Sequence, residues 1–167
     1  EYAGKINQLT AVDGRMEVLR SKGWPTAVVD YAHTPDALKN VLETLKPHCK
    51  GNLRLVFGCG GDRDIGKRAE MAQIAEALAD DILITDDNPR NEDPDSITDE
   101  ILTGFSSLLG IRVVHDRKQA IASMFENAKE NDIVLIAGKG HETWQEVKGK
   151  RSFFSDAQEV RLNMGMS

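Results

Sequence analysis

The sequence predicts an α/β fold with an open, mostly parallel sheet flanked by helices on both faces, and a C-terminal β-hairpin. Short apolar runs alternate along the chain with amphipathic stretches of helical periodicity. Repeated β–α units need crossover connections, which place helices on both faces of a parallel sheet. The runs are continuously apolar, as in strands that are covered on both sides. Together these features predict a Rossmann-like architecture.

The first three β–α units occupy the first two thirds of the chain. Strands are expected at residues 27–31, 53–57 and 82–85. Thr34 is expected to cap the first helix, with Pro35 at its first position. The three helices are expected to bury one apolar stripe each: Leu38, Val41, Leu42 and Leu45 in the first, Met71, Ile74, Ala75 and Leu78 in the second, and Ile97, Ile101, Phe105 and Leu108 in the third.

The last third is expected to contain two more strands, at residues 111–114 and 132–137. Between them, Asp116 is expected to cap a helix. A hairpin is predicted around residues 144–154, with its turn at 148–150, and Asp156 is expected to open a final helix. The apolar positions of these last two helices are Ile121, Met124, Phe125 and Ala128, then Val160 and Met164.

Length and composition favour one soluble domain. The 167 residues are ample for one domain and short for two. Residues 26–167 are expected to form it, with residues 1–25 as a lead-in segment from a preceding domain. Because the chain lacks an initiator Met, we expect it to be a fragment of a longer protein.

Charge and apolar patterning argue against several classes of protein. A net charge of -6 disfavours a nucleic-acid partner. The longest apolar runs, such as 133–137, are too short to cross a bilayer, and no signal peptide is visible. Cys49 and Cys59 have no partner at metal-ligand spacing, so we expect no metal site, a buried thiol at Cys59 and a cytoplasmic location.

Polar and glycine-rich clusters follow four of the predicted strands, at residues 30–33, 58–64, 86–90 and 138–142. Ligands of open α/β sheets bind beyond the carboxyl ends of the strands. One such cluster alone is best interpreted as a solvated turn. Four at the same edge predict a binding site.

Three familiar motifs are nearly matched there, and each fails at one position. Residues 58–63 begin a dinucleotide fingerprint, but Arg63 stands at the third glycine position. Residues 61–67 resemble a phosphate loop, but Arg68 replaces the Ser or Thr that holds magnesium, and two aspartates would repel a triphosphate. Residues 141–145 lack the second histidine of a zinc-protease helix.

The same clusters suit a small zwitterion. The guanidinium groups of Arg63 and Arg90 can bind carboxylates. Asp87, Asn88, Glu142 and an exposed glycine carbonyl can accept from an ammonium group. The alternatives left open are a surface ion-pair cluster around Arg63 and a simple turn at 87–89.

Five motifs, in order along nearly the whole chain, closely resemble those of the C-terminal domain of the Mur ligases, the cytoplasmic enzymes that build the peptidoglycan precursor. They are residues 14–17, 30–37, 58–64, 87–90 and 138–142. The Asp-Asn-Pro-Arg tetrad at 87–90 resembles the recognition motif of the members that add meso-diaminopimelate, and lysine-adding members typically differ there.

The resemblance implies two groups of site residues. The diaminopimelate site would be lined by Arg63, Asp87, Asn88, Pro89, Arg90, Gly138 and Glu142. Three further residues would reach ATP: Arg15 the phosphates, Asp30 the ribose hydroxyls, and His33. The alternative for His33 is a hydrogen bond at the helix entry without any ligand.

The family reaction is an ATP-dependent amide formation on the UDP-N-acetylmuramoyl-dipeptide. ATP phosphorylates a carboxylate, and the amine of diaminopimelate attacks the acyl phosphate. The family's phosphate loop, Mg²⁺ ligands and UDP-sugar domain are missing from this chain, so we expect a monomer that is inactive alone. No general base is named. A lysine-adding Mur ligase and a non-catalytic α/β binding module remain alternatives.

Overall fold

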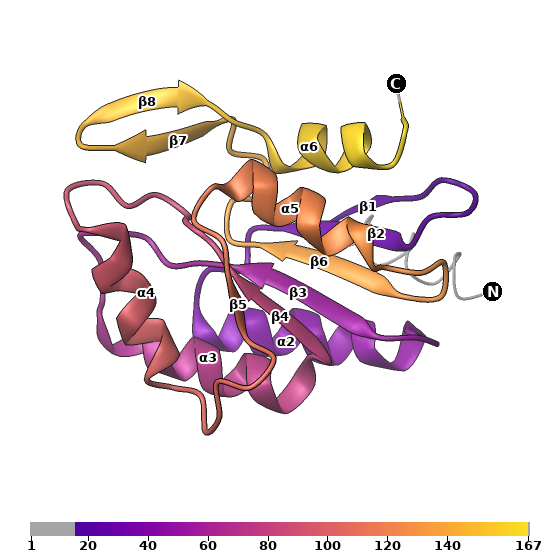
Figure 1. Ribbon diagram of the computed structural model, residues 1–167, viewed down its shortest axis with the longest axis horizontal. Helices are drawn as coiled ribbons and strands as arrows, with labels where there is room; N and C mark the ends of the chain where they lie inside the picture. Colours follow the sequence, from indigo (N-terminus) through magenta and orange to yellow (C-terminus); the bar gives the residue numbers. More distant parts are fainter. Residues whose placement is uncertain (1–15, 167) are drawn as a thin grey trace.

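The computed structural model describes residues 16–166 and contains a six-stranded sheet in the order β1-β2-β6-β3-β4-β5 (Figure 1). Strand β1 is antiparallel to β2, and the other neighbours pair in parallel. The strands are β1 (Glu17–Leu19), β2 (Thr26–Asp30), β3 (Leu53–Phe57), β4 (Asp81–Ile84), β5 (Arg112–Val113) and β6 (Ile133–Ala137).

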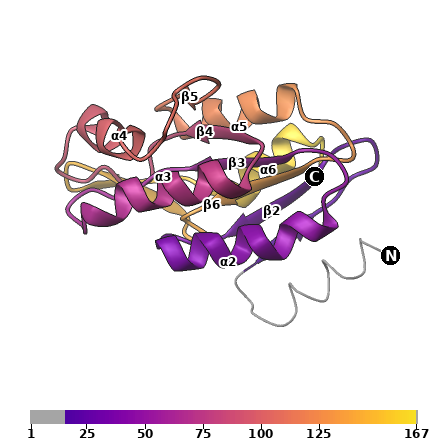
Figure 2. The same ribbon diagram turned by 90° about the horizontal axis from the view of Figure 1, so that it is seen from below.

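Helices cover both faces of this sheet, as predicted. One layer contains α2 (Pro35–Leu45), the short η1 (Lys46–His48), α3 (Gly66–Leu78) and α4 (Pro94–Leu102), and the other contains α5 (Arg117–Glu126) and α6 (Asp156–Asn163) (Figures 1 and 2). Within residues 16–166, no helix has the length and apolar character needed to cross a membrane.

Each central strand contributes side chains to both layers of the core. Along β6, Leu135 packs into the layer of α2, α3 and α4, whereas its neighbours Val134 and Ile136 pack into the layer of α5 and α6. All five residues of β6 are buried. This two-sided burial explains why the strands are continuously apolar.

The end of α4 differs from the prediction. The helix stops at Leu102, so Phe105 and Leu108 follow it in a loop, with Phe105 buried and Leu108 exposed. The reason is close packing: a Cβ atom on Gly104 would lie 2.1 Å from the carbonyl oxygen of Ala69 in α3. Only glycine fits, and the chain turns there.

Two smaller differences concern the first strand and its neighbour. Strand β2 ends at Asp30, which leaves Tyr31 outside it and exposed. Strand β1 was not predicted, because three residues are too few to show a periodicity. In addition, α5 ends at Glu126, two residues before the predicted Ala128.

The predicted hairpin is confirmed as β7 (Trp144–Val147) and β8 (Lys150–Phe153). Lys148 and Gly149 both have positive φ, 51° and 77°, as a two-residue turn of type I′ requires. The caps at Thr34 and Asp116 are also confirmed, since their side chains accept from Ala37 N and Gln119 N.

At the opposite end of the sheet from the hairpin, Asp132 joins three segments. Its carboxylate accepts hydrogen bonds of 2.8 Å each from Asn52 N, Lys129 N and Arg54 Nε. Burial alone would raise the pKa of Asp132, but these donors hold that pKa below its ordinary value of 3.8.

We expect Asp132→Ala to lower the free energy of unfolding by about 3 kcal/mol at neutral pH, because it leaves buried donors and Arg54 without their acceptor. A depressed folded-state pKa adds stability above the unfolded pKa, and that stability is lost as pH falls through the folded pKa. Urea unfolding at pH 7 and pH 3 checks both statements. The exposed neighbour Glu130, changed to Gln, is the control. Equal losses at both pH values would contradict the expectation.

Candidate functional site

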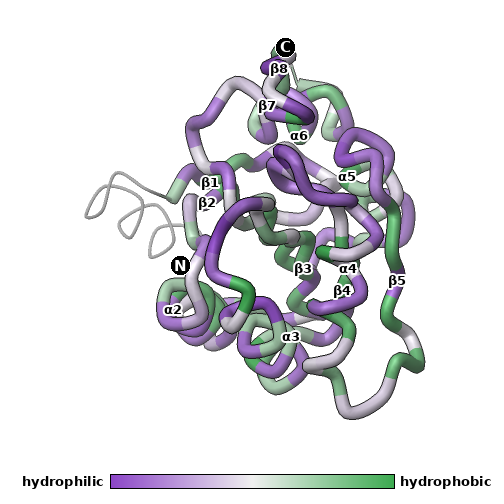
Figure 3. The backbone as a smooth tube through the Cα atoms, turned by 90° about the vertical axis from the view of Figure 1, so that its left-hand side faces the viewer, coloured by the Kyte–Doolittle hydropathy of each residue, from purple (hydrophilic) through white to green (hydrophobic). Residues whose placement is uncertain are grey.

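The four polar clusters meet at one edge of the sheet. Strands β2, β3, β4 and β6 run in parallel, so the loops after them leave the sheet on the same side. Figure 3 looks onto this edge, where largely hydrophilic loops surround the hydrophobic strands. Backbone hydrogen bonds join the loop starts: Gly138 N donates to Asp30 O (3.0 Å) and Thr85 N to Phe57 O (2.9 Å).

These loops enclose an open cleft of about 200 Å³. Its lining residues are Tyr31, His33, Gly58, Cys59, Gly60, Arg63, Lys67, Asp87, Asn88, Arg90, Gly138 and Glu142. Six of the seven residues predicted for diaminopimelate are therefore brought together. The seventh, Pro89, does not line the cleft. It is buried, and its carbonyl oxygen packs so closely on Gly61 that a Cβ there would lie 1.8 Å away.

The backbone of Arg90 forms an isolated parallel β-bridge with β7 of the hairpin. Its N–H donates to Glu146 O (3.0 Å), and its carbonyl accepts from Lys148 N (2.8 Å). Its φ of 53° turns the chain at this point. The guanidinium NH1 donates to Gly61 O (3.0 Å), and Nε lies 3.8 Å from Glu146 Oε1 of the hairpin. Arg63, which also lines the cleft, is exposed, and its NH1 donates to the carbonyl of Asp62 (3.0 Å).

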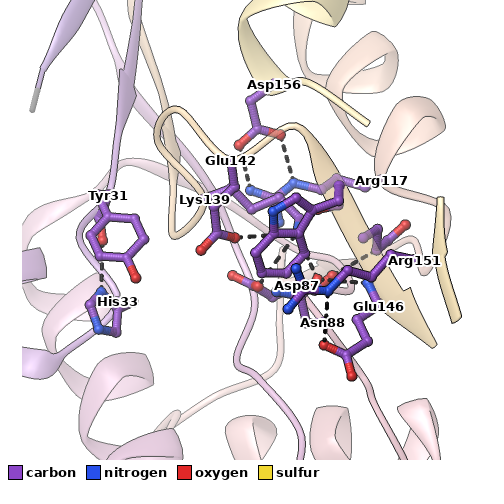
Figure 4. Close-up of polar contacts among 12 residues, drawn as sticks. Tyr31, His33, Asp87, Asn88, Arg117, Lys139, Glu142, Glu146, Arg151 and Asp156 are labelled. Atoms are coloured by element: carbon purple, nitrogen blue, oxygen red, sulfur yellow. Dashed lines mark hydrogen bonds and ion pairs between the residues drawn. The ribbon is translucent and has the colours of Figure 1, made fainter. Parts of the chain in front are cut away.

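Asn88 links three segments through its side chain (Figure 4). Its Oδ1 accepts from Lys139 Nζ (2.8 Å) and from Glu146 N (2.9 Å). Because the oxygen is occupied twice, the orientation of the amide is settled. Its NH₂ group is the part that faces Glu142 and the cleft.

A fully buried ammonium group lies beneath the cleft. Lys139 Nζ is 3.8 Å from both Asp87 Oδ1 and Glu142 Oε1, and donates to the carbonyl of Trp144 (2.9 Å). Burial lowers the pKa of Lys139, opposed chiefly by Asp87. Burial raises the pKa of Glu142, opposed chiefly by Lys139. One cation is thus shared by two carboxylates, so a second ammonium group would be attracted to them.

A second buried cation supports the loops that follow β4 and β6. Arg117 forms a bidentate pair with Asp156, with both side chains fully buried and distances of 2.7 and 2.8 Å (Figure 4). The same guanidinium donates to Asp86 O (3.0 Å) and Ala137 O (3.1 Å). These two carbonyls mark where the chain leaves β4 and β6, so the pair positions both loops.

The loop at 58–64 is held by Arg68. This buried guanidinium donates to Gly60 O and to Glu92, and Glu92 Oε1 in turn accepts from Asp62 N (2.7 Å). The residue that breaks the phosphate-loop motif therefore shapes the loop around its own guanidinium. Asp64 similarly accepts from Gly66 N at the start of α3, a donor that a phosphate loop would direct to its ligand.

The three residues predicted for ATP are placed differently. Arg15 lies outside the described residues. Asp30 is buried, and its Oδ2 accepts from Ala32 N (2.8 Å). His33 is exposed at the rim of the cleft, with its Nδ1 2.9 Å from the carbonyl of Tyr31. Figure 4 shows His33 and Tyr31 together, apart from the Asp87 and Lys139 cluster.

Sequence analysis missed several contributors. Lys67 and Tyr31 line the cleft, and Arg117 and Asp156 support it from below, yet none stands at a distinctive spacing. In the sequence, the three charged residues stand near the start of a predicted helix and Tyr31 ends a predicted strand. Such positions do not by themselves indicate a binding site. Cys59 is buried as predicted, and burial raises its pKa to about 12. Among residues 16–166, no group of three or more His, Cys, Asp or Glu side chains is arranged to hold a metal ion.

The chain matches a family described as Mur ligase, glutamate ligase domain, over residues 14–140. The UDP-N-acetylmuramoyl-L-alanyl-D-glutamate--2,6-diaminopimelate ligase of Pseudomonas syringae pv. tomato is 54% identical over 147 residues, which are 88% of this chain and 30% of the relative. The Vibrio parahaemolyticus protein of the same name is 49% identical over 160 residues, or 96% of this chain and 32% of the relative. The chain thus spans about a third of these relatives.

Solved structures agree with the sequence comparison. A UDP-N-acetylmuramoyl-L-alanyl-D-glutamate--2,6-diaminopimelate ligase superposes with a TM-score of 0.86 and 49% identity, over 92% of this chain and 32% of that one. A Mycobacterium tuberculosis folylpolyglutamate synthase complexed with ADP gives a TM-score of 0.59 at 21% identity, over 75% of this chain and 29% of that one. The second similarity shows a shared fold only.

His115 connects the two ends of the loop that carries Asp87 to Arg90. Its Nδ1 lies 2.7 Å from Asp86 Oδ1, and its Nε2 lies 2.8 Å from Asp95 Oδ1 in the first turn of α4. The hydrogen bond with Asp86 raises the pKa of His115 above its ordinary value of 6.5, with partial opposition from burial.

We expect Arg117→Met to lower the free energy of unfolding by about 3–5 kcal/mol, because it leaves Asp156 buried and uncompensated. The exposed neighbour Lys118, changed to Met, serves as the control and is expected to have little effect. Urea unfolding measures both. The double change Arg117→Met with Asp156→Leu should recover part of the loss, and a double variant less stable than Arg117→Met would contradict this account.

We expect protonation of His115 to stabilise the loop. A raised folded-state pKa gives a contribution that is fully present below 6.5 and is lost as pH rises through the raised folded value. His115→Gln should therefore flatten the decline of stability on the alkaline side of pH 6.5. Thermal unfolding of both proteins from pH 5.5 to 9 measures this, and parallel pH profiles would refute it.

Proposed function

Because this chain belongs to the Mur ligase family, we propose that it is the amino-acid-binding C-terminal domain of an ATP-dependent ligase. That enzyme would add meso-diaminopimelate to UDP-N-acetylmuramoyl-L-alanyl-D-glutamate in the cytoplasm. The observation that carries the proposal is the cleft at the sheet edge. It brings two guanidinium groups, Arg63 and Arg90, within one small space that also contains the carboxylates of Asp87 and Glu142.

This set of groups fits a molecule with an amino-acid head at each end. Arg90 would bind the distal carboxylate and Arg63 the other one, since a guanidinium fork matches a carboxylate. The distal ammonium would be held by Glu142, with the carbonyl of Gly138. Gly138 is required here: its φ is 118°, and a Cβ atom would lie 2.5 Å from Asp87 Oδ2.

The remaining chemistry would take place between domains. The amine at the free end of diaminopimelate must be neutral to attack the acyl phosphate, and enclosure of the cleft would exclude competing water. This chain would hold and orient the nucleophile, and the other domains would supply the UDP-dipeptide. By itself the chain is expected to be inactive.

ATP and Mg²⁺ would be bound chiefly outside this chain, because residues 16–166 offer neither a phosphate loop nor a carboxylate cluster for the metal. ATP would supply the phosphoryl group that activates the carboxylate. The rim of the cleft suits a nucleotide, since Lys67 and His33 lie there side by side, with Lys67 Nζ donating to His33 O (3.0 Å). Arg15 and Asp30 are proposed as further contacts.

Two alternatives make different demands on the site. A lysine-adding ligase would leave Arg90 facing a ligand without a second carboxylate, in a side chain that is 15% exposed. A non-catalytic module does not require a cleft that contains two arginines, Arg63 and Arg90, together with two carboxylates, Asp87 and Glu142. We further propose a monomer without nucleic-acid or membrane partners, in keeping with the net charge of -6.

Calorimetric titration of this chain separates the three hypotheses. We expect meso-diaminopimelate to bind more tightly than L-lysine, and Arg90→Gln to weaken diaminopimelate binding about tenfold to a hundredfold, since a charge-assisted bond is lost. Lysine binding should barely change in that variant. Lys150→Gln, an exposed charge on the hairpin, is the control. Equal affinity for both amino acids, or no binding of either, would overturn the assignment.

A further inference from the structure

Glu146 of the hairpin lies between two arginines. Its Oε1 is 3.8 Å from Arg90 Nε and 3.7 Å from Arg151 Nε. Both distances are too long for a good hydrogen bond, so neither arginine holds the carboxylate alone. Figure 4 shows Glu146 and Arg151 side by side, next to Asn88. The charge of Glu146 is therefore divided between a residue of the cleft and a residue outside it.

The position of Arg151 is determined by the hairpin. Arg151 stands directly opposite Glu146 in the β7–β8 register. Trp144, two residues before Glu146, lies on the same face of β7, and the Arg151 guanidinium carbon stacks 3.9 Å from the centre of its ring. The Arg151 side chain is 60% exposed, so this stacking is its main restraint.

This arrangement leaves the carboxylate of Glu146 shared between two guanidinium groups. Two guanidinium groups face one carboxylate, and Arg90, which lines the cleft, is only partly neutralised. If Arg151 were absent, Glu146 would pair with Arg90 alone. A ligand carboxylate would then have to displace Glu146 before it could bind.

We propose that Arg151 is a specificity-determining positioning residue, which draws Glu146 away from Arg90 and keeps Arg90 available for the second carboxylate of a dicarboxylic diamino acid. The inference rests on the proposed function for the identity of the ligand. Arg151 need not touch the ligand, because it acts through Glu146. Its effect is confined to ligands that carry the second carboxylate.

Four variants test the proposal by titration with meso-diaminopimelate and L-lysine. Arg151→Gln is expected to weaken diaminopimelate binding about threefold to fivefold, the range of a partly exposed ion pair, and to leave lysine binding unchanged. Glu146→Gln is expected not to weaken it. The double variant should bind diaminopimelate like Glu146→Gln, because no carboxylate remains to block Arg90. Lys150→Gln removes an equal charge from the same hairpin and is expected to behave like the parent.

A measurement without ligand separates this proposal from the proposed function. We expect the Arg90 Nε–H proton, observed by ¹⁵N NMR, to exchange more slowly with water in Arg151→Gln, because Glu146 moves onto it. An unchanged exchange rate would refute the claim that Arg151 draws the Glu146 carboxylate away from Arg90. An equal loss of lysine and diaminopimelate binding, or a double variant as weak as Arg151→Gln, would overturn the specificity role. A parent chain that binds neither amino acid would refute both the proposed function and the specificity role of Arg151. The exchange rate of the Arg90 Nε–H proton would still show whether Arg90 and Arg151 share the Glu146 carboxylate.

Discussion

The buried ammonium group of Lys139 is the interaction on which the rest of the site depends. It is fully buried and reaches Asn88, the carbonyl of Trp144, and the carboxylates of Asp87 and Glu142. Through these contacts one cation joins the loop after β4, the loop after β6 and the hairpin. A charge removed from water in this way is tolerated only if its partners stay in place. The need to satisfy Lys139 therefore holds the walls of the cleft together.

The buried and the exposed arginines of the site have different roles. Arg68 and Arg117 are buried, donate to protein acceptors and shape the loops. Arg63 and Arg90 instead line the cleft, and each donates a hydrogen bond to a backbone carbonyl. Guanidinium groups thus support the loops below the cleft and line the cleft itself.

The hairpin connects the fold to one wall of the cleft. It forms no part of the main sheet, yet its β7 edge pairs with the backbone of Arg90 and its Glu146 amide fixes Asn88. Both partners belong to the Asp-Asn-Pro-Arg tetrad.

Within residues 16–166, the sequence by itself determined every strand except β1, four of the five α-helices with their buried stripes, and the edge of the sheet at which the polar clusters collect. Those features depend on local periodicity, on caps such as Thr34 and on parallel topology, all of which are visible in a linear chain. The end of α4 could not be predicted, because it depends on how closely Gly104 approaches Ala69 in another helix. The same holds for Arg117 with Asp156 and for Glu146 with Arg151. Only the tertiary structure decided which charges are buried partners and which remain free for a ligand, because an ion pair depends on distance in space.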